Sequence, residues 1–198
     1  MKLYFVSRNE SKIEEITDML QLRAAKAPLD IELMPVRENV QEILSPALED
    51  VVRLKAYEAY RLVHHPCVVE HGGLFFDHAK DFPGVFGRIV WRSLQDRMTA
   101  FLRDGDSRQA VARAYLGYCD GRRIHIFRGE TTGEVAQAAR GEYNRNSWDP
   151  IFIPRGSTTT YGEMGMAEKR STSPLIKAWE LFLTELDAAT ARDRGRET

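Results

Sequence analysis

Short apolar segments alternate with amphipathic ones through the first third of the chain. Alternating or β-branched residues indicate strands, whereas apolar residues three or four positions apart indicate helices. These patterns predict strands at 2–6, 31–36 and 67–70, with helices at 11–24 and 48–63 between them. This order is typical of parallel strands joined by crossover helices, which bind ligands at the carboxyl ends of the strands. The polar turns after the first and third strands are therefore candidate ligand sites.

The rest of the chain predicts antiparallel strands and two more helices. The pattern places a helix at 94–102, strands at 111–119, 123–127 and 132–139, and a last helix opened by Ser173-Pro174. Asp120-Gly121 predicts a hairpin turn. Two boundaries follow from local signals: a capping box at Ser11 and Glu14 begins the first helix, and His71-Gly72-Gly73 ends the third strand. We expect an α/β fold with a mixed central sheet and flanking helices.

Composition narrows the class of protein. With 198 residues, of which 43% are apolar, the chain has material for one core, so we expect a single domain at 1–186 and a disordered polar tail at 187–198. The net charge of -1 gives no basic field for nucleic acid. We find no signal peptide and no apolar run of about 18 residues, and both cysteines lie in apolar segments. A cytoplasmic protein with no membrane segment is expected.

Polar residues around the start of the first helix indicate an anion site. Ser7, Asn9 and Lys12 lie where free backbone N–H groups and the positive end of the helix dipole favour a phosphate. An ordinary helix cap with a solvated lysine explains the same spacing. Lys55 and Arg88 are further cations that could reach phosphates, although such side chains on helices usually face solvent.

Carboxylates and an indole lie near other predicted loop ends. A magnesium-triphosphate site needs one or two carboxylates, and Glu42, Asp50, Glu70 and Asp77 are candidates, each of which alone is more commonly a surface charge. Trp148-Asp149 precedes an apolar segment, so the indole could stack on a base and the carboxylate accept from it, whereas core packing is the simpler interpretation. Lys169 could reach a base carbonyl.

Taken in order, several motifs resemble the Ham1 family of inosine triphosphate pyrophosphatases. They are Ser7-Arg8-Asn9-Glu10-Ser11-Lys12, Val69-Glu70-His71-Gly72-Gly73-Leu74, Phe82-Pro83-Gly84-Val85-Phe86, Trp148-Asp149-Pro150, and Thr160-Tyr161-Gly162-Glu163-Met164 followed by Glu168-Lys169. Each motif is weak alone, but their order covers nearly the whole chain. The resemblance implies a fold with a central nucleotide-binding cleft, commonly dimeric, that cuts ITP, dITP or XTP between the α and β phosphates with Mg²⁺.

The resemblance also implies roles for individual residues. By position, Ser7, Asn9, Lys12 and Lys55 would hold the triphosphate, Glu42 and Glu70 the metal, and Arg88, Trp148, Asp149 and Lys169 the nucleoside. Two departures stand out. His71 occupies the place of the aspartate that binds metal and activates water, and an imidazole supplies no negative charge to a hard ion. Ser173-Pro174-Leu175 replaces a Ser-His-Arg that reads the purine oxygen, so base specificity has moved elsewhere, relaxed or changed.

Two functional hypotheses remain open at this point. One is a nucleotide-binding sensor with little hydrolysis, similar to the HAM1-like subunits of anti-phage defence systems, which would need an effector protein as partner. The other is an active pyrophosphatase with altered base specificity, in which Glu70 together with His71 or Asp77 would be catalytic. A relic without any ligand is a third possibility, and the retained Asn9, Lys12 and Lys55 argue against it.

Overall fold

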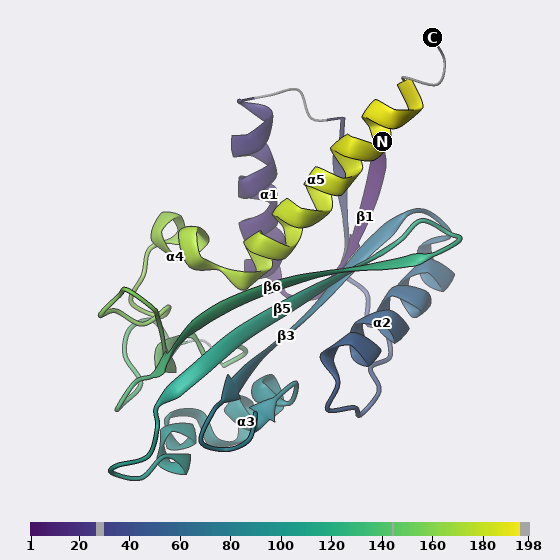
Figure 1. The fold of residues 1–198 in the computed structure, drawn as a ribbon. Helices are drawn as coiled ribbons and strands as arrows, with labels where there is room; N and C mark the ends of the chain where they lie inside the picture. Colours follow the sequence, from purple (N-terminus) through teal and green to yellow (C-terminus); the bar gives the residue numbers. More distant parts are fainter. Residues whose placement is uncertain (27–29, 144, 195–198) are drawn as a thin grey trace.

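The computed structural model describes residues 1–26, 30–143 and 145–194. They form one mixed sheet with helices packed against it (Figure 1). Its strands are β1 (Lys2–Val6), β2 (Glu32–Val36), β3 (Cys67–Phe76), β4 (Pro83–Gly84), β5 (Gln109–Cys119), β6 (Ile124–Val135) and β7 (Phe152–Pro154). In these residues the order is β2-β1-β3-β5-β6-β7, with β4 paired to β3. β1 is parallel to β2 and β3, and the pairs beyond β3 are antiparallel. The predicted α/β fold class is confirmed.

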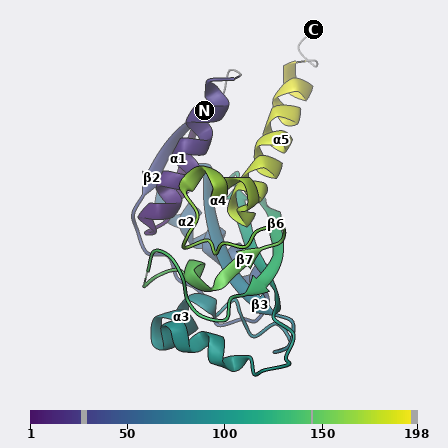
Figure 2. The same ribbon diagram turned by 90° about the vertical axis from the view of Figure 1, so that its left-hand side faces the viewer.

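Helices cover both faces of this sheet. They are α1 (Glu10–Ala24), α2 (Leu48–Val63), α3 (Gly87–Leu94), α4 (Met166–Thr172) and α5 (Pro174–Arg194), with the short 3₁₀ helices η1 (Gln95–Phe101) and η2 (Asp149–Ile151). α1 and α5 pack on one face, where Trp179 meets Phe5 edge-on, and α2 packs on the other against Val69. Figure 2 shows α3 at the opposite end from α1 and α5, with α4 between them. A separate core cluster lies under α3.

Two predicted strand boundaries were wrong, and each lies beside a glycine. β3 continues past Gly72-Gly73 to Phe76, and a Cβ on Gly73 would lie 2.3 Å from the carbonyl oxygen of Gly84 in β4. β6 is one strand rather than two, and a Cβ on Gly129 would lie 1.8 Å from the carbonyl oxygen of Pro174. Both glycines therefore lie within strands and allow another backbone to approach closely.

Helix boundaries also differ in part from the prediction. The second helix is confirmed at Leu48–Val63, but α1 begins at Glu10 with Asn9 as its N-cap, so the capping box at Ser11 does not form. The helix expected at 94–102 is the end of α3 followed by η1, because the backbone turns at Gln95, where φ is 54°. The expected tail is partly wrong as well: α5 runs to Arg194, while 195–198 lie outside the described residues.

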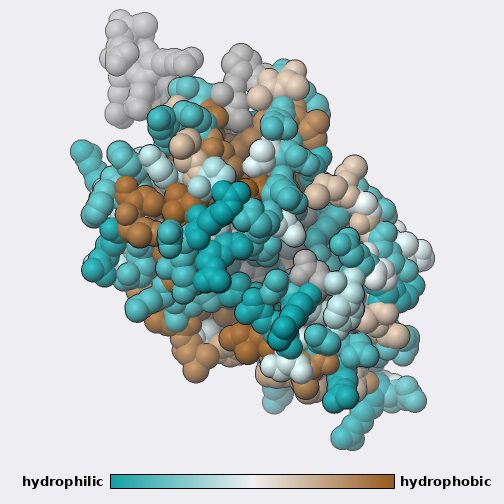
Figure 3. Space-filling view, turned by 180° about the vertical axis from the view of Figure 1, so that it is seen from behind, coloured by the Kyte–Doolittle hydropathy of each residue, from teal (hydrophilic) through white to brown (hydrophobic). Residues whose placement is uncertain are grey.

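The described residues contain no helix that is long and apolar enough to span a membrane. Seen from behind, apolar side chains gather in small groups separated by hydrophilic ones (Figure 3). Cys67 and Cys119, which the sequence places in apolar segments, are free and buried and face each other across β3 and β5.

Candidate functional site

Two adjoining hollows of about 290 and 420 Å³ form one cleft in the middle of the molecule. Both are lined by Asn9, Lys55, Glu70 and Arg88. The topology explains the position, because β1 pairs with β3 at Tyr4–Cys67 and Phe5–Val68 and ends one residue later. The next part of β3 therefore extends past the end of β1 and presents its side chains to the cleft, as expected for the carboxyl end of a parallel strand.

The start of α1 forms one wall of the cleft. Asn9 is its N-cap, and its side chain makes no capping hydrogen bond within the described residues. The Asn9 N–H donates instead to Ser7 Oγ at 3.3 Å, which shapes the turn after β1. The first helical turn therefore begins at the hollow that Ser7, Asn9 and Ser11 line, and helix N-termini carry N–H groups without intrahelical partners. This turn has the local geometry of an anion site.

Two lysines from different helices meet at Glu70. Lys12 on α1 hydrogen-bonds the Glu70 carboxylate, and Lys55 on α2 donates to the Glu70 backbone carbonyl at 2.9 Å. Burial alone would raise the pKa of Glu70, but the positive charges of Lys12 and Lys55 outweigh it and leave the pKa lowered. We call Lys12, Lys55 and Glu70, together with Asn9 and Glu42, the phosphate end of the cleft. Ion pairs between the lysines and the glutamates hold this group together.

Glu42 is surrounded by positive groups. Its carboxylate accepts from Lys55 at 2.8 Å, and Arg88 donates to its other oxygen at 3.4 Å. His71 Nδ1 lies 3.6 Å from Glu42 Oε1. The interaction with His71, followed by the charge of Lys55, holds the pKa of Glu42 well below its ordinary value. The loop residue that the sequence proposed for metal binding is therefore brought to the cleft beside Glu70.

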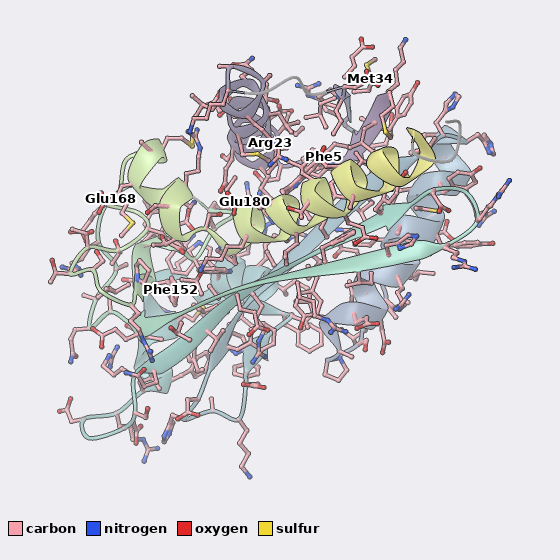
Figure 4. The ribbon with its side chains drawn as sticks, turned by 45° about the horizontal axis from the view of Figure 1, so that its top comes forward. Phe5, Arg23, Met34, Phe152, Glu168 and Glu180 are labelled. Carbon is pink, nitrogen blue, oxygen red and sulfur yellow. The ribbon has the colours of Figure 1, made fainter. Side chains whose placement is uncertain are left out.

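The opposite part of the cleft, which we call the base end, is formed by η2, α4 and the start of α5. Asp149 and Lys169 form an ion pair, and the Lys169 ammonium lies 5.5 Å from the centre of the Tyr161 ring. Trp148 packs edge-on against Phe152, a core residue labelled in Figure 4, with 5.8 Å between ring centres. The sequence analysis assigned four residues to the nucleoside. All of them line the hollow of about 290 Å³: Arg88, Trp148, Asp149 and Lys169.

Comparison with known proteins identifies the fold and the family. The model of the Ham1 family matches residues 3–185. The chain belongs to the Ham1 family. The dITP/XTP pyrophosphatase of Pyrococcus horikoshii is 32% identical over 184 residues, which are 92% of this chain and 95% of that protein. The dITP/XTP pyrophosphatase of Methanopyrus kandleri is 33% identical over 184 residues, covering 92% and 94%.

Solved structures agree on the architecture. The HAM1 protein from Coxiella burnetii superimposes with a TM-score of 0.79 at 22% identity, covering 95% of this chain and 99% of the other. At this identity the likeness shows the Ham1 fold and carries no residue roles. Together with the family match, it accounts for the mixed sheet and for the cleft between its helices.

The first departure from the Ham1 motif, His71, is held on the opposite side of β3 from Glu70. Successive residues of a strand alternate between faces, so Glu70 reaches α1 while His71 reaches Glu42 and the loop at Val85. His71 Nε2 lies 3.2 Å from the Val85 carbonyl oxygen, which can only accept, so Nε2 carries a hydrogen. The other ring nitrogen faces a carboxylate. Both ring nitrogens of His71 are therefore directed at oxygen atoms of the protein.

Asp77, the substitute base that the sequence offered, is not brought to this Ham1 cleft. It lies in the exposed turn after β3, and it lines neither hollow. The sequence analysis ended β3 at Glu70. A strand that ended there would leave Asp77 in a nearby loop, from which its carboxylate could reach the cleft. With six more residues in the strand, β3 carries Asp77 away from Glu70.

Sequence reasoning missed Glu15 and Tyr161 as cleft residues. Glu15 follows Lys12 by three positions on α1, and residues at that spacing share a helical face, which was the available signal. Tyr161 lies within a motif that the resemblance quoted, but it received no role. Ser173 lines the cleft too, and Pro174 and Leu175 accompany it in place of the histidine and arginine of the Ham1 motif.

Proposed function

We propose that this chain binds a purine nucleoside triphosphate of the ITP, dITP or XTP type in the cleft. The triphosphate would lie at the phosphate end, and the nucleoside would reach the base end at Trp148 and Asp149. One observation carries the proposal: Lys12, Lys55 and Arg88 come from three helices and line the hollow of about 290 Å³, together with Asn9 and Ser11 at the N-terminus of α1. Cations and free helix N–H groups together are suited to phosphate oxygens.

Magnesium fits this cleft as a partner of the nucleotide. Among the described residues no three His, Cys, Asp or Glu side chains converge as a metal site, and lysines hold both Glu42 and Glu70. Mg²⁺ commonly binds through one or two carboxylates together with substrate phosphates rather than in an all-protein cage. Glu42 and Glu70 would therefore hold an ion that arrives with the triphosphate. The ion would neutralise phosphate charge.

We propose further that hydrolysis is weak and that binding itself is the function, as in a sensor. Attack of water on a phosphate needs a group that accepts the proton, and both nitrogens of His71 face acceptors already. Loss of a general base lowers turnover by about 10²- to 10⁴-fold. Glu70 is the other candidate, but its carboxylate is engaged by Lys12.

Active hydrolysis is the alternative, and the relatives favour it. The similar proteins from Pyrococcus horikoshii and Methanopyrus kandleri are named dITP/XTP pyrophosphatases. On this alternative, displacement of Lys12 by the triphosphate would free Glu70 to accept the proton. The products would be a nucleoside monophosphate and pyrophosphate.

Two partners are proposed for the sensor: a second copy of the chain and an effector protein. Exposed apolar side chains such as Leu44, at 85% exposure, and Ile89, at 60%, offer surface for such contacts. Light scattering on the purified protein tests the homodimer, and affinity capture with and without dITP tests whether an effector depends on nucleotide.

One assay separates binding from hydrolysis. The purified protein is incubated with Mg²⁺ and ITP, dITP, XTP or the standard nucleoside triphosphates, and pyrophosphate release and thermal stabilisation are followed together. A sensor gives stabilisation without turnover, and Lys12→Ala abolishes it. Lys26→Ala changes an exposed lysine two residues after the end of the same helix; it is the matched control and keeps the stabilisation. Pyrophosphate release at a rate usual for enzymes, above about 1 per second, would reject the sensor.

A further inference from the structure

Arg92 is a second arginine of α3 beside the phosphate end of the cleft. It follows Arg88 by four positions, and residues at that spacing share a helical face. Both arginines line the hollow of about 420 Å³, together with Asn9 and Lys55. The Arg92 side chain therefore borders the same space as the residues that would hold the triphosphate.

The two hollows give the cleft a direction. Trp148, Asp149 and Lys169 line the hollow of about 290 Å³ but not the other one. Arg92 lines the hollow of about 420 Å³ but not the first. The α phosphate of a nucleotide is attached to the sugar, so a nucleoside at the base end would direct its later phosphates toward the second hollow. The terminal phosphate would come nearest to Arg92.

The Arg92 guanidinium is held in position by a neutral group. Its Nε and Nη2 donate to the side-chain oxygen of Asn146 at 3.0 and 2.5 Å. Lys55 and Arg88, by contrast, both contact the Glu42 carboxylate. No ion pair between Arg92 and a carboxylate occurs within the described residues, so a neighbouring anion does not neutralise its charge. A guanidinium also has further N–H donors beyond the two that Asn146 accepts.

We propose that Arg92 binds the terminal phosphate and makes the cleft prefer a nucleoside triphosphate to a diphosphate. Its remaining N–H groups would donate to oxygens of this phosphate, which the planar guanidinium suits, while Asn146 keeps the side chain in place. A diphosphate would end before it reached Arg92. The inference rests on the proposed function, because a nucleoside at the base end is what sets the direction of the phosphates.

Calorimetric titration with nucleotides that cannot be cut between the α and β phosphates tests this directly. The α,β-methylene analogues of ITP and of inosine diphosphate are compared at fixed Mg²⁺. The two ligands differ only by the terminal phosphate, so the ratio of their affinities measures what that phosphate contributes. We expect the wild type to bind the triphosphate at least about tenfold more tightly, because charge-assisted hydrogen bonds to phosphate are strong.

Two matched variants assign the preference to the residue. Arg92→Gln keeps a polar side chain but removes the charge, so affinity for the triphosphate analogue should fall by about tenfold. Affinity for the diphosphate analogue should stay within about twofold of the wild type, which also reports that the variant is folded. Arg97→Gln makes the same change at an exposed arginine of η1 that lines neither hollow, and it should leave both affinities unchanged.

The outcomes separate this inference from the proposed function. A preference for the triphosphate that survives in Arg92→Gln overturns the role of Arg92 and leaves nucleotide binding in place. Equal losses of affinity for the two analogues overturn it as well, because they would show that Arg92 only supports the segment around Asn146. Failure of the wild type to bind either analogue overturns the proposed function and the inference together.

Discussion

The two ends of the cleft differ in how their charged groups are used in the unbound protein. At the phosphate end Lys12 is paired with Glu70, and Lys55 is paired with Glu42. The same cations that would bind a ligand therefore also hold α1, α2 and β3 together. At the base end Pro174 and Leu175 provide no such links. Residues with both structural and binding roles are harder to replace than residues with one. Of the two departures from the Ham1 motif, Pro174 and Leu175 lie at the base end, whereas His71 contacts Glu42 at the phosphate end.

The largest expected effect is a gain of turnover when His71 is replaced by aspartate. His71→Asp supplies a carboxylate that can accept a proton and add negative charge for Mg²⁺, so pyrophosphate release from dITP should rise about 100-fold. The new charge faces Glu42, and the variant should therefore be less stable without Mg²⁺ than with it. His71→Asn, similar in size but unable to act as a base, is the control. An unchanged rate would show that position 71 does not limit hydrolysis.

The next effect concerns Lys55, which contacts Glu42 and Glu70 and which we propose also binds the triphosphate. Lys55→Met keeps the apolar stem but leaves Glu42 and the Glu70 carbonyl without their donor, so the free energy of unfolding should fall by about 2 kcal/mol and tripolyphosphate affinity by tenfold or more. Urea denaturation and calorimetry measure the two. Arg53→Met, on the same helix in an exposed pair with Glu49, should change stability by less than about 1 kcal/mol. If Lys55→Met kept its stability, the phosphate end would be a binding site only.

The base end should respond to alkali through Tyr161. Burial raises the pKa of Tyr161 to about 12 from its ordinary value of 10.0. A group whose folded-state pKa is raised contributes stability that is present below the unfolded-state pKa and is lost between the two values as pH rises. Tyr161→Phe, which removes the hydrogen bond to Thr172, should cost about 1 kcal/mol at pH 7.

Thermal melts of the wild type and Tyr161→Phe at pH 7, 9 and 11 check this dependence. The stability advantage of the wild type should shrink between pH 9 and 11. Tyr57→Phe on the exposed side of α2 is the control, with no change in the difference across pH. A constant advantage up to pH 11 would contradict a buried phenol at the base end.

The last variant, Asp77→Asn, is expected to have no effect. Asp77 is exposed and outside the cleft, so Asp77→Asn should leave nucleotide binding, residual pyrophosphate release and melting temperature unchanged within error. Parallel assays with the wild type measure all three. A loss of residual turnover of tenfold or more would restore Asp77 as the proton acceptor and would require the turn after β3 to move.

The sequence predicts best where one pattern decides the structure. Helix α2 has a continuous amphipathic pattern and was predicted at its observed bounds, whereas two predicted strands stopped before Gly73 and Gly129 although both strands continue. The reason is physical: a glycine marks either a turn or a close backbone approach, and only the tertiary neighbour tells them apart. Local sequence cannot show that β4 lies over Gly73 or that α5 begins over Gly129.

The same limit applies to the cleft. Ordered motifs were enough to nominate Lys12, Lys55 and Glu70, which the fold brings into contact. The spacing from Lys12 could have placed Glu15 on the same helical face, but no local pattern shows its contact with Ser173, which is 158 positions away. Residues that act through distant partners are visible only once the helices are packed.

The hydrogen bond between Ser173 and Glu15 joins the first helix to the last one. Since a ribosome makes Glu15 158 positions before Ser173, the base end of the cleft is assembled only after α5 has begun to emerge. A nucleotide can therefore stabilise the finished protein by mass action, but it has no complete pocket to enter on a nascent chain. Cellular nucleotide levels would affect how long this protein persists after synthesis rather than how it first folds.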